Sequence, residues 1–146
     1  MDWWIKTSTY TLSDLRYNKK NSPHSKAVSS ALVRGRLICD GRPAAGVKVK
    51  LWDVDRTDMD DLMDEKTTNS NGEFQLAGWT KEYTTIDPKL SIYHDCNDGI
   101  KPCQRKFSIL IPDSYVSHGK VPKKVYDAGT IQLEGGFPGE SRDCVN

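Results

Sequence analysis

TTNSNGEFQLAG, residues 67–78, carries the clearest structural signal in this chain. Its Asn71-Gly72 pair predicts a two-residue hairpin turn of type I′, because that turn needs a positive φ at both central positions and these two residue types tolerate it. After the turn, Phe74 and Leu76 alternate with polar residues, which is the period-two pattern of a strand with one buried face. The stretch therefore predicts a β-hairpin whose second strand faces a core.

Alternating runs elsewhere in the chain predict further strands. Apolar and polar residues largely alternate in two runs before this stretch and in three runs after it. These runs are residues 33–39, 47–54, 90–94, 107–111 and 125–133. Turn signals such as Asp40-Gly41 separate them, and no long helical pattern is convincing. Seven to eight short strands of this kind predict an all-β protein, an antiparallel β-sandwich of the immunoglobulin-like class.

The composition indicates one small domain without a partner dictated by net charge. The chain has 146 residues and a formal net charge of +1, which favours neither nucleic acid nor a membrane as a partner. Residues 1–30 differ in composition and are interpreted as an N-terminal arm or an expression leader that can be disordered, with the domain at residues 31–146. The arm lacks the apolar centre of a signal peptide, so we expect that a secretion leader has been removed.

The four cysteines favour disulfides and an oxidising, extracellular compartment. No CxxC pair or zinc-like spacing of Cys and His is present. Four cysteines allow three pairings. The spacing favours Cys96–Cys103, which would close a short loop, and Cys39–Cys144, which would tie the tail to the first core strand. The alternative is four reduced thiols in a cytosolic protein.

An acidic segment at residues 53–65 is the first candidate binding site, with seven acidic residues and one basic residue. Calcium takes six to eight oxygen ligands, which clustered aspartates can supply. The candidate calcium ligands are Asp53, Asp55, Asp58, Asp60 and Asp61. The alternative is a solvated acidic loop in which Asp58 caps a helical turn at residues 59–63. No other cofactor is expected.

A second candidate surface combines aromatic and basic residues. If the strands alternate in direction, the connections at residues 53–65, 79–87 and 113–124 lie at one end of the sandwich. Aromatic residues anchor protein interfaces, and lysines attract an anionic membrane surface. The candidate partner-binding residues are Trp52, Trp79, Tyr83, Lys120, Lys123 and Lys124. Trp52 shares the outward face of its predicted strand with Lys48 and Lys50 and is interpreted either as part of an interface or as part of a solvated stripe.

The histidines give only weak indications of catalysis. His94 ends a predicted strand and precedes an acidic residue, so it is either a general base, a metal ligand or, as we favour, a structural histidine. Ser114 and Ser117 lie near His118 in the sequence, but no G-x-S-x-G motif is present. His24 is the third histidine of the chain. No catalytic residue is therefore predicted.

Five separate runs in this chain resemble the nematode transthyretin-like family of secreted proteins. They are VRGRLICDGRPAAGVKVKLWDVD, TNSNGEFQLAG, TTIDPKLSIYHDCNDG, IPDSY and FPGESRDC. The resemblance implies a transthyretin-like β-sandwich, secretion, and disulfides among the four cysteines. One member of that family is described as a bridging protein that joins phosphatidylserine on dying cells to an engulfment receptor. Others are described as parasite effectors that bind host proteins. The implied partner is an extracellular or host protein, or an anionic phospholipid such as phosphatidylserine.

The transthyretin fold also includes hydroxyisourate hydrolase, which this chain does not match. That enzyme closes its site with a C-terminal Tyr-Arg-Gly-Ser tail, whereas this chain ends in Asp-Cys-Val-Asn. We therefore expect a secreted, non-catalytic binding or adaptor module rather than an enzyme. The alternative is a carrier of a small hydrophobic ligand in the channel of an oligomer, and a hydrolase is less favoured.

Overall fold

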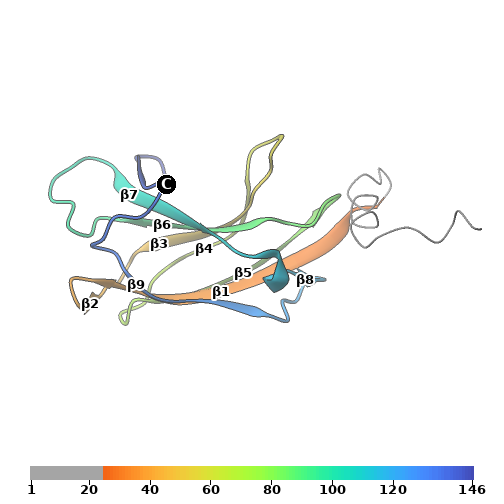
Figure 1. The fold of residues 1–146 in the computed structure, drawn as a ribbon, viewed down its shortest axis with the longest axis horizontal. Helices are drawn as coiled ribbons and strands as arrows, with labels where there is room; N and C mark the ends of the chain where they lie inside the picture. Colours follow the sequence, from red (N-terminus) through yellow and green to blue (C-terminus); the bar gives the residue numbers. More distant parts are fainter. Residues whose placement is uncertain (1–24) are drawn as a thin grey trace, which may run out of the picture.

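The computed structural model describes residues 25–146 as a two-layer β-sandwich (Figure 1). Sheet A contains β1 (Ala27–Cys39), β2 (Arg42–Pro43), β5 (Glu73–Glu82), β8 (Ser117–His118) and β9 (Val125–Gln132). Sheet B has the order β10 (Ser141–Asp143), β7 (Gln104–Leu110), β6 (Pro88–His94), β3 (Lys48–Asp53), β4 (Asp61–Thr67). A short 3₁₀ helix, η2 (Asp113–Tyr115), is the one helix in these residues. The predicted all-β sandwich with two disulfides is confirmed.

Sheet A contains one parallel pair in an otherwise antiparallel fold. β5 and β8 run antiparallel to β1, whereas β9 runs parallel to it from Leu32 onward. The direction follows from the chain path, because the connection at residues 119–124 turns the chain back after β8. β9 then continues along the edge of β1 that β8 begins to cover.

The core lies between the two sheets and comes from alternate positions of their strands. In β3, buried residues alternate with half-buried ones, as the period-two pattern predicts. The fully buried aliphatic side chains of the described residues include Val33, Leu37, Val49, Leu51, Leu76, Ile86, Leu90, Ile92 and Leu133. Burying each of these stabilises the fold by about 1.5–3 kcal/mol before entropy is counted.

The turn at Asn71-Gly72 joins the two sheets and is not a hairpin within one sheet. β4 pairs with β3, whereas β5 pairs with β1. The prediction of a type I′ turn is wrong, because Gly72 has a φ of +76° and Asn71 does not have a positive φ. Asn69 organises the turn instead: its carbonyl accepts the N–H of Gly72 at 2.9 Å, and its Oδ1 accepts the N–H groups of Asn71 and Glu73.

Several strand ends also differ from the predicted ones. β1 begins at Ala27, four residues before the expected domain start at residue 31. Residues 1–24 of the predicted arm lie outside the described residues. Residues 59–63 do not form a helical turn, because β4 begins at Asp61 and pairs with β3. Trp79 lies inside β5, which continues to Glu82, and not in a linker.

The disulfide pairing is Cys39–Cys96 and Cys103–Cys144, so the predicted pairing is wrong. Cys39 ends β1 in sheet A, and Cys96 follows β6 in sheet B, so the first bridge ties the two layers together. Cys103 and Cys144 flank β7 and β10, which are paired antiparallel. The register of β7 and β10 therefore places these two cysteines opposite each other, and proximity in the sequence does not decide the pairing.

Candidate binding surfaces

One end of the sandwich carries the connections at residues 53–65, 79–87 and 113–124 (Figure 1). The alternation of strand directions predicts this arrangement. The backbone N–H of Asp87 donates to Oδ1 of Asp53 at 2.9 Å, which joins the connection after β5 to the end of β3. The Nζ atom of Lys120 lies 4.5 Å from the centre of the Trp79 ring. The acidic, aromatic and basic segments therefore share this end of the fold.

Two exposed aromatic residues, each with a lysine over its ring, form an aromatic–basic surface made of Lys26, Trp79, Tyr83 and Lys120. The exposed fraction is 47% for Trp79 and 45% for Tyr83. Lys26 Nζ lies 5.0 Å from the Tyr83 ring centre, and Lys120 covers Trp79. Because β5 fixes Trp79 on a strand, this large side chain is presented to solvent from a rigid support.

The other predicted partner-binding residues make no contact with these two rings among the described residues. Lys123 and Lys124 follow Lys120 on the same connection, and Lys124 donates its Nζ to the carbonyl of Ser114 at 2.7 Å. Trp52 lies on β3, in the other sheet, where Lys50 Nζ is 5.4 Å from its ring centre. The structure thus separates Trp52 from the aromatic–basic surface.

An acidic cluster forms where β3 ends, β4 begins and β5 ends. Carboxylate oxygens of Asp53, Asp61 and Glu82 lie within 4.8 Å of one another. Asp53 is only 5% exposed, and its burial, with the nearby charges of Asp87 and Asp61, raises its pKa to about 6. Burial and a hydrogen bond with Asp61 also raise the pKa of Glu82. A proton or a cation would relieve the repulsion among these groups.

Only two of the five predicted calcium ligands belong to this cluster. Asp55 and Asp58 use their carboxylates to accept backbone N–H groups of their own loop. Asp60 pairs with Lys89 at 2.7 Å. Glu82, which the sequence did not single out, joins the cluster because β5 brings it from the opposite sheet to the ends of β3 and β4. Three carboxylates are a smaller ligand set than the one predicted.

A sequence model of the Transthyretin-like family matches residues 34–112, more than half of the chain. This chain belongs to the nematode transthyretin-like family. Its relatives in Caenorhabditis elegans include Transthyretin-like protein 5, which is 64% identical over 118 residues, covering 80% of this chain and 85% of that protein. Transthyretin-like protein 2 is 51% identical over 123 residues, covering 80% of this chain and 83% of that protein.

Two solved structures are more distantly similar to this transthyretin-like protein. The crystal structure of (S)-allantoin synthase has 15% identity and a TM-score of 0.44, covering 70% of this chain and 40% of that chain. A 9R-lipoxygenase from Cyanothece has 20% identity and a TM-score of 0.39, covering 71% of this chain and 16% of that chain. At these values neither structure informs the function of this chain.

His94 occupies a structural position in this transthyretin-like protein. It is 2% exposed, and its Nδ1 atom accepts the N–H of Cys96 at 3.1 Å. Burial and the charge of Arg105 lower its pKa, so the imidazole is neutral at neutral pH. His118 is exposed beside a surface hollow of about 520 Å³, and within residues 25–146 no hydrogen bond joins its imidazole ring to a serine side chain.

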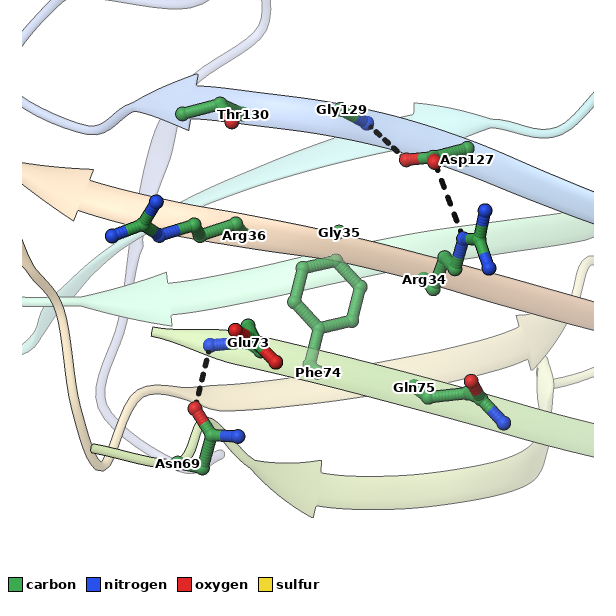
Figure 2. A pocket seen from close by; sticks show the side chains of 10 residues that line it. All are labelled: Arg34, Gly35, Arg36, Asn69, Glu73, Phe74, Gln75, Asp127, Gly129 and Thr130. Carbon is green, nitrogen blue, oxygen red and sulfur yellow. Dashed lines mark hydrogen bonds and ion pairs between the residues drawn. The ribbon is translucent and has the colours of Figure 1, made fainter. Parts of the chain in front are cut away.

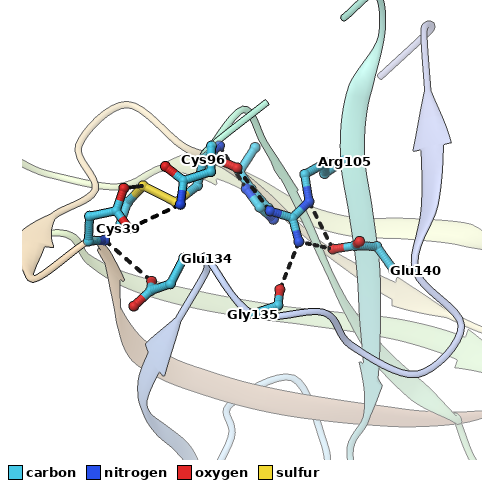
Figure 3. Close-up of a disulfide and its surroundings, with 9 residues drawn as sticks. Cys39, Cys96, Arg105, Glu134, Gly135 and Glu140 are labelled. Carbon is cyan, nitrogen blue, oxygen red and sulfur yellow. Dashed lines mark hydrogen bonds and ion pairs between the residues drawn. A yellow bond between two sulfur atoms is a disulfide. The ribbon is translucent and has the colours of Figure 1, made fainter. Parts of the chain in front are cut away.

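Arg105 holds the C-terminal tail against the Cys39–Cys96 bridge (Figure 3). Its guanidinium donates to the carboxylate of Glu140 at 2.7 and 3.1 Å, to the carbonyl of Cys96 at 2.9 Å and to that of Gly135 at 2.7 Å. Both N–H groups converge on one oxygen of Glu140, Oε1, and hydrogen bonds between two charged groups are stronger than those between neutral ones. No local pattern indicates this role of Arg105, because its partners lie up to 35 residues away in the sequence.

Residues 25–146 include no helix that is long and apolar enough to cross a membrane.

We expect Asp53→Asn to stabilise the protein by about 1–2 kcal/mol at neutral pH. The folded-state pKa of Asp53, about 6, lies above its ordinary value of 3.8, so the folded state binds the proton more tightly. The wild-type protein therefore loses stability as the pH rises from 3.8 to about 6. Asparagine keeps an acceptor for the Asp87 N–H and removes the charge.

Thermal unfolding across the acidic and neutral range tests this expectation. The gain in stability from Asp53→Asn should disappear at a pH below the ordinary pKa of an aspartate. There, the Asp53 carboxyl of the wild type is protonated in both the folded and the unfolded state. An equal Tm for the two proteins at neutral pH would contradict it. The calcium prediction is tested in the same experiment, since bound Ca²⁺ should raise the Tm of the wild type more than that of Asp53→Asn.

Proposed function

We propose that this chain is a secreted, non-catalytic binding module that recognises an extracellular protein through the aromatic–basic surface. Membership of the transthyretin-like family supports a non-enzymatic binding module in general. Two disulfides are typical of small domains in oxidising compartments. The observation that carries the proposal is the pair of half-exposed aromatic rings, Trp79 and Tyr83, each covered by a lysine.

This surface has the chemistry of an interface centre. Trp and Tyr bury large areas with few rotatable bonds and dominate the energetics of many protein interfaces. A lysine stacked on the ring adds a cation that can pair with a partner carboxylate as the ring becomes buried. We therefore expect a partner that offers an apolar pocket rimmed by acidic residues.

An anionic phospholipid surface, such as one containing phosphatidylserine, is the second candidate partner. The connection after β8 carries Lys120, Lys123 and Lys124, of which Lys120 lies over the half-exposed Trp79. Lysines near an anionic membrane each contribute about 1 kcal/mol. The acidic cluster at the same end of the sandwich opposes this attraction unless a cation neutralises it. The protein partner is the better supported of the two candidates for this reason.

A carrier or hydrolase function receives less support from the geometry. Packed side chains fill the space between the sheets in the described part of the chain. Two surface hollows there, one beside Arg36 and one beside His118, are lined in part by polar residues. A hydrophobic ligand would need a channel between subunits. A hydrolase that used His94 would need this side chain to reach a substrate, but His94 is enclosed in the core.

We expect the triple variant Trp79→Ala, Tyr83→Ala, Lys120→Gln to lose partner binding by roughly tenfold or more, as truncation of anchoring residues does. Trp52→Ala is the matched control, because it removes a tryptophan from the other sheet. Binding is measured by capture from extracellular fluid, followed by titration of the identified partner. Equal binding by the triple variant and the wild type would refute the proposal.

Liposomes with and without phosphatidylserine form the second arm of this experiment. Binding that requires phosphatidylserine and weakens as salt increases would assign the surface to a membrane. Capture of a protein partner together with indifference to phosphatidylserine supports the protein assignment.

A further inference from the structure

A groove of about 600 Å³ crosses the outer face of sheet A, where β5 and β9 flank β1 (Figure 2). Arg34 and Arg36 of β1 extend in opposite directions from the centre of the groove. The ring of Phe74 lies between β5 and β1 beside Gly35 and forms the floor. The sequence did not single out this groove, because its lining residues come from three separate strands.

Two glycines open the sheet at this point. A Cβ atom at Gly35 would lie 2.8 Å from the Phe74 ring, so the ring occupies the space that a side chain would fill. The pairing of β1 with β9 shifts in register between Arg34 and Arg36, close to Gly129, whose φ is +71°. A bulge of this kind re-aims neighbouring side chains, and the strands around it keep the groove rigid.

Each arginine is held through its Nε atom alone. Arg34 Nε donates to Asp127 Oδ2 at 3.2 Å, and Arg36 Nε donates to the carbonyl of Asn71 at 3.1 Å. Within residues 25–146, the terminal amino groups of both side chains make no further hydrogen bond. A planar guanidinium anchored in this way still presents two donors to a carboxylate.

Arg36 and Glu73 carry opposite charges and have no ion pair in the described residues. They lie directly opposite each other on β1 and β5, yet no salt bridge joins them or pairs either one with another group between residues 25 and 146. Arg34, by contrast, is paired with Asp127. The groove thus offers one free cation and one free carboxylate on neighbouring strands.

The outer face of sheet B differs, because its lysines are paired within the molecule. Each has a carboxylate within 4 Å: the pairs are Lys48–Glu65, Lys50–Glu65, Lys89–Asp60 and Lys106–Asp143. The unpaired charges on sheet A are therefore not a general feature of this protein surface.

Uncharged polar side chains complete the lining of the groove. Asn69 uses its Oδ1 atom within its own turn, which leaves its amide N–H₂ as a donor. The side chains of Gln75 and Thr130 make no hydrogen bond to the described residues. Amide and hydroxyl groups of this kind bond readily to the N–H and C=O groups of a peptide.

We infer that this groove binds an extended peptide segment of the partner protein, with an acidic side chain on Arg36 and a basic side chain on Glu73. The inference rests on the proposed function, in which the partner is a protein. In an extended segment, alternate residues point the same way and lie about 6.6–6.8 Å apart. The Cα atoms of paired residues on neighbouring strands are about 4.5–5.5 Å apart, and the charged ends of Arg36 and Glu73 lie beyond ion-pair distance of each other. Alternate positions of an extended peptide can therefore reach the two charges separately, which favours an acidic-x-basic spacing.

The groove also lies on the same face as Trp79, and β5 contributes to both. One partner can therefore place an apolar residue against Trp79 and an extended segment in the groove. A lipid surface fits the groove less well, since Glu73 and Asp127 would face the anionic headgroups and repel them.

An NMR titration of the ¹⁵N-labelled full chain with the peptide acetyl-Ser-Glu-Ser-Lys-Ser-amide tests the inference. We expect saturable shifts of the Arg36 Nε–H signal and of the backbone amides of Glu73 and Gln75. Arg36→Gln and Glu73→Gln should each weaken binding by roughly tenfold, the effect of losing a hydrogen bond to a charged group. Arg56→Gln, an exposed arginine at the other end of the fold, is the matched control variant.

The charge-swapped variant Arg36→Glu, Glu73→Arg should retain binding, because the peptide can lie in the reverse order. Equal binding of a control peptide with glutamine at both charged positions would overturn the inference, as would unchanged binding by Arg36→Gln. Loss of phosphatidylserine-vesicle binding in Arg36→Gln, with no peptide effect, would assign the groove to lipid instead and also overturn it. Partner capture that Trp79→Ala abolishes and Arg36→Gln leaves intact would overturn the groove inference while the proposed function stands.

Discussion

Removing the Cys39–Cys96 bridge with the double substitution Cys39→Ala, Cys96→Ala should lower the free energy of unfolding by about 4 kcal/mol. The two cysteines are 57 residues apart in the sequence, and closing a loop of that size removes much of the unfolded chain's freedom. The bridge also joins the end of β1 in one sheet to the end of β6 in the other. Its loss therefore weakens the contact between the layers as well.

The Cys103–Cys144 bridge provides an internal comparison. Its sequence separation of 41 residues gives a similar chain-entropy effect, but it secures only β10, a three-residue edge strand. After its removal the tail can detach locally and regain freedom while the two sheets stay packed, so we expect a loss of about 2 kcal/mol. Urea unfolding of both double variants under non-reducing conditions measures the difference. Equal losses, or a loss below 1 kcal/mol for the first pair, would contradict this account of how the bridges act.

Gly72→Ala should destabilise the protein by about 2–4 kcal/mol. A Cβ atom at this position would lie 2.2 Å from the carbonyl oxygen of Leu37 and 3.1 Å from the backbone nitrogen of Ala44. Those two groups are hydrogen-bonded to each other at 2.9 Å, and the carbonyl of Gly72 itself accepts the N–H of Leu37. Because all of the obstructing atoms belong to the backbone, no side chain can move aside.

Gly41→Ala is the matched control for this substitution. Gly41 has a φ of +77°, almost that of Gly72, but a Cβ atom there would meet nothing within 4 Å. It should therefore cost only the conformational penalty, about 1–2 kcal/mol, and the difference between the two variants isolates the steric effect. Equilibrium unfolding in urea provides both values, and equal values would show that the close approach of Gly72 to β1 is unimportant.

The Asn71-Gly72 pair illustrates why a correct residue-level signal predicted the wrong local structure. The pair does mark a turn, and Gly72 does need a positive φ. The pattern in the sequence, however, cannot distinguish a turn inside one sheet from a turn between two sheets, since both are followed by an alternating strand. The packing of Gly72 against Leu37, together with the hydrogen bonds of Asn69, selects the second arrangement.

The candidate surfaces also have one feature that the sequence predicts and one that it does not. The order of the strands was enough to predict that the acidic, aromatic and basic connections share one end, because alternating strands place every second connection there. It was not enough to predict that Glu82 replaces three of the aspartates in the acidic cluster. That exchange depends on where β5 of the opposite sheet ends, and a linear pattern contains no information on contacts between sheets.

Local pattern and family motifs were sufficient to predict a two-layer β-sandwich with disulfides, because period-two alternation specifies a strand and its buried face within a few residues. The disulfide pairing, the acidic cluster and the groove around Arg36 arose only when segments tens of residues apart were set in register. Each depends on which atoms of distant strands come to lie opposite one another. Packing of the whole chain establishes that relationship, and short-range spacing along the sequence does not.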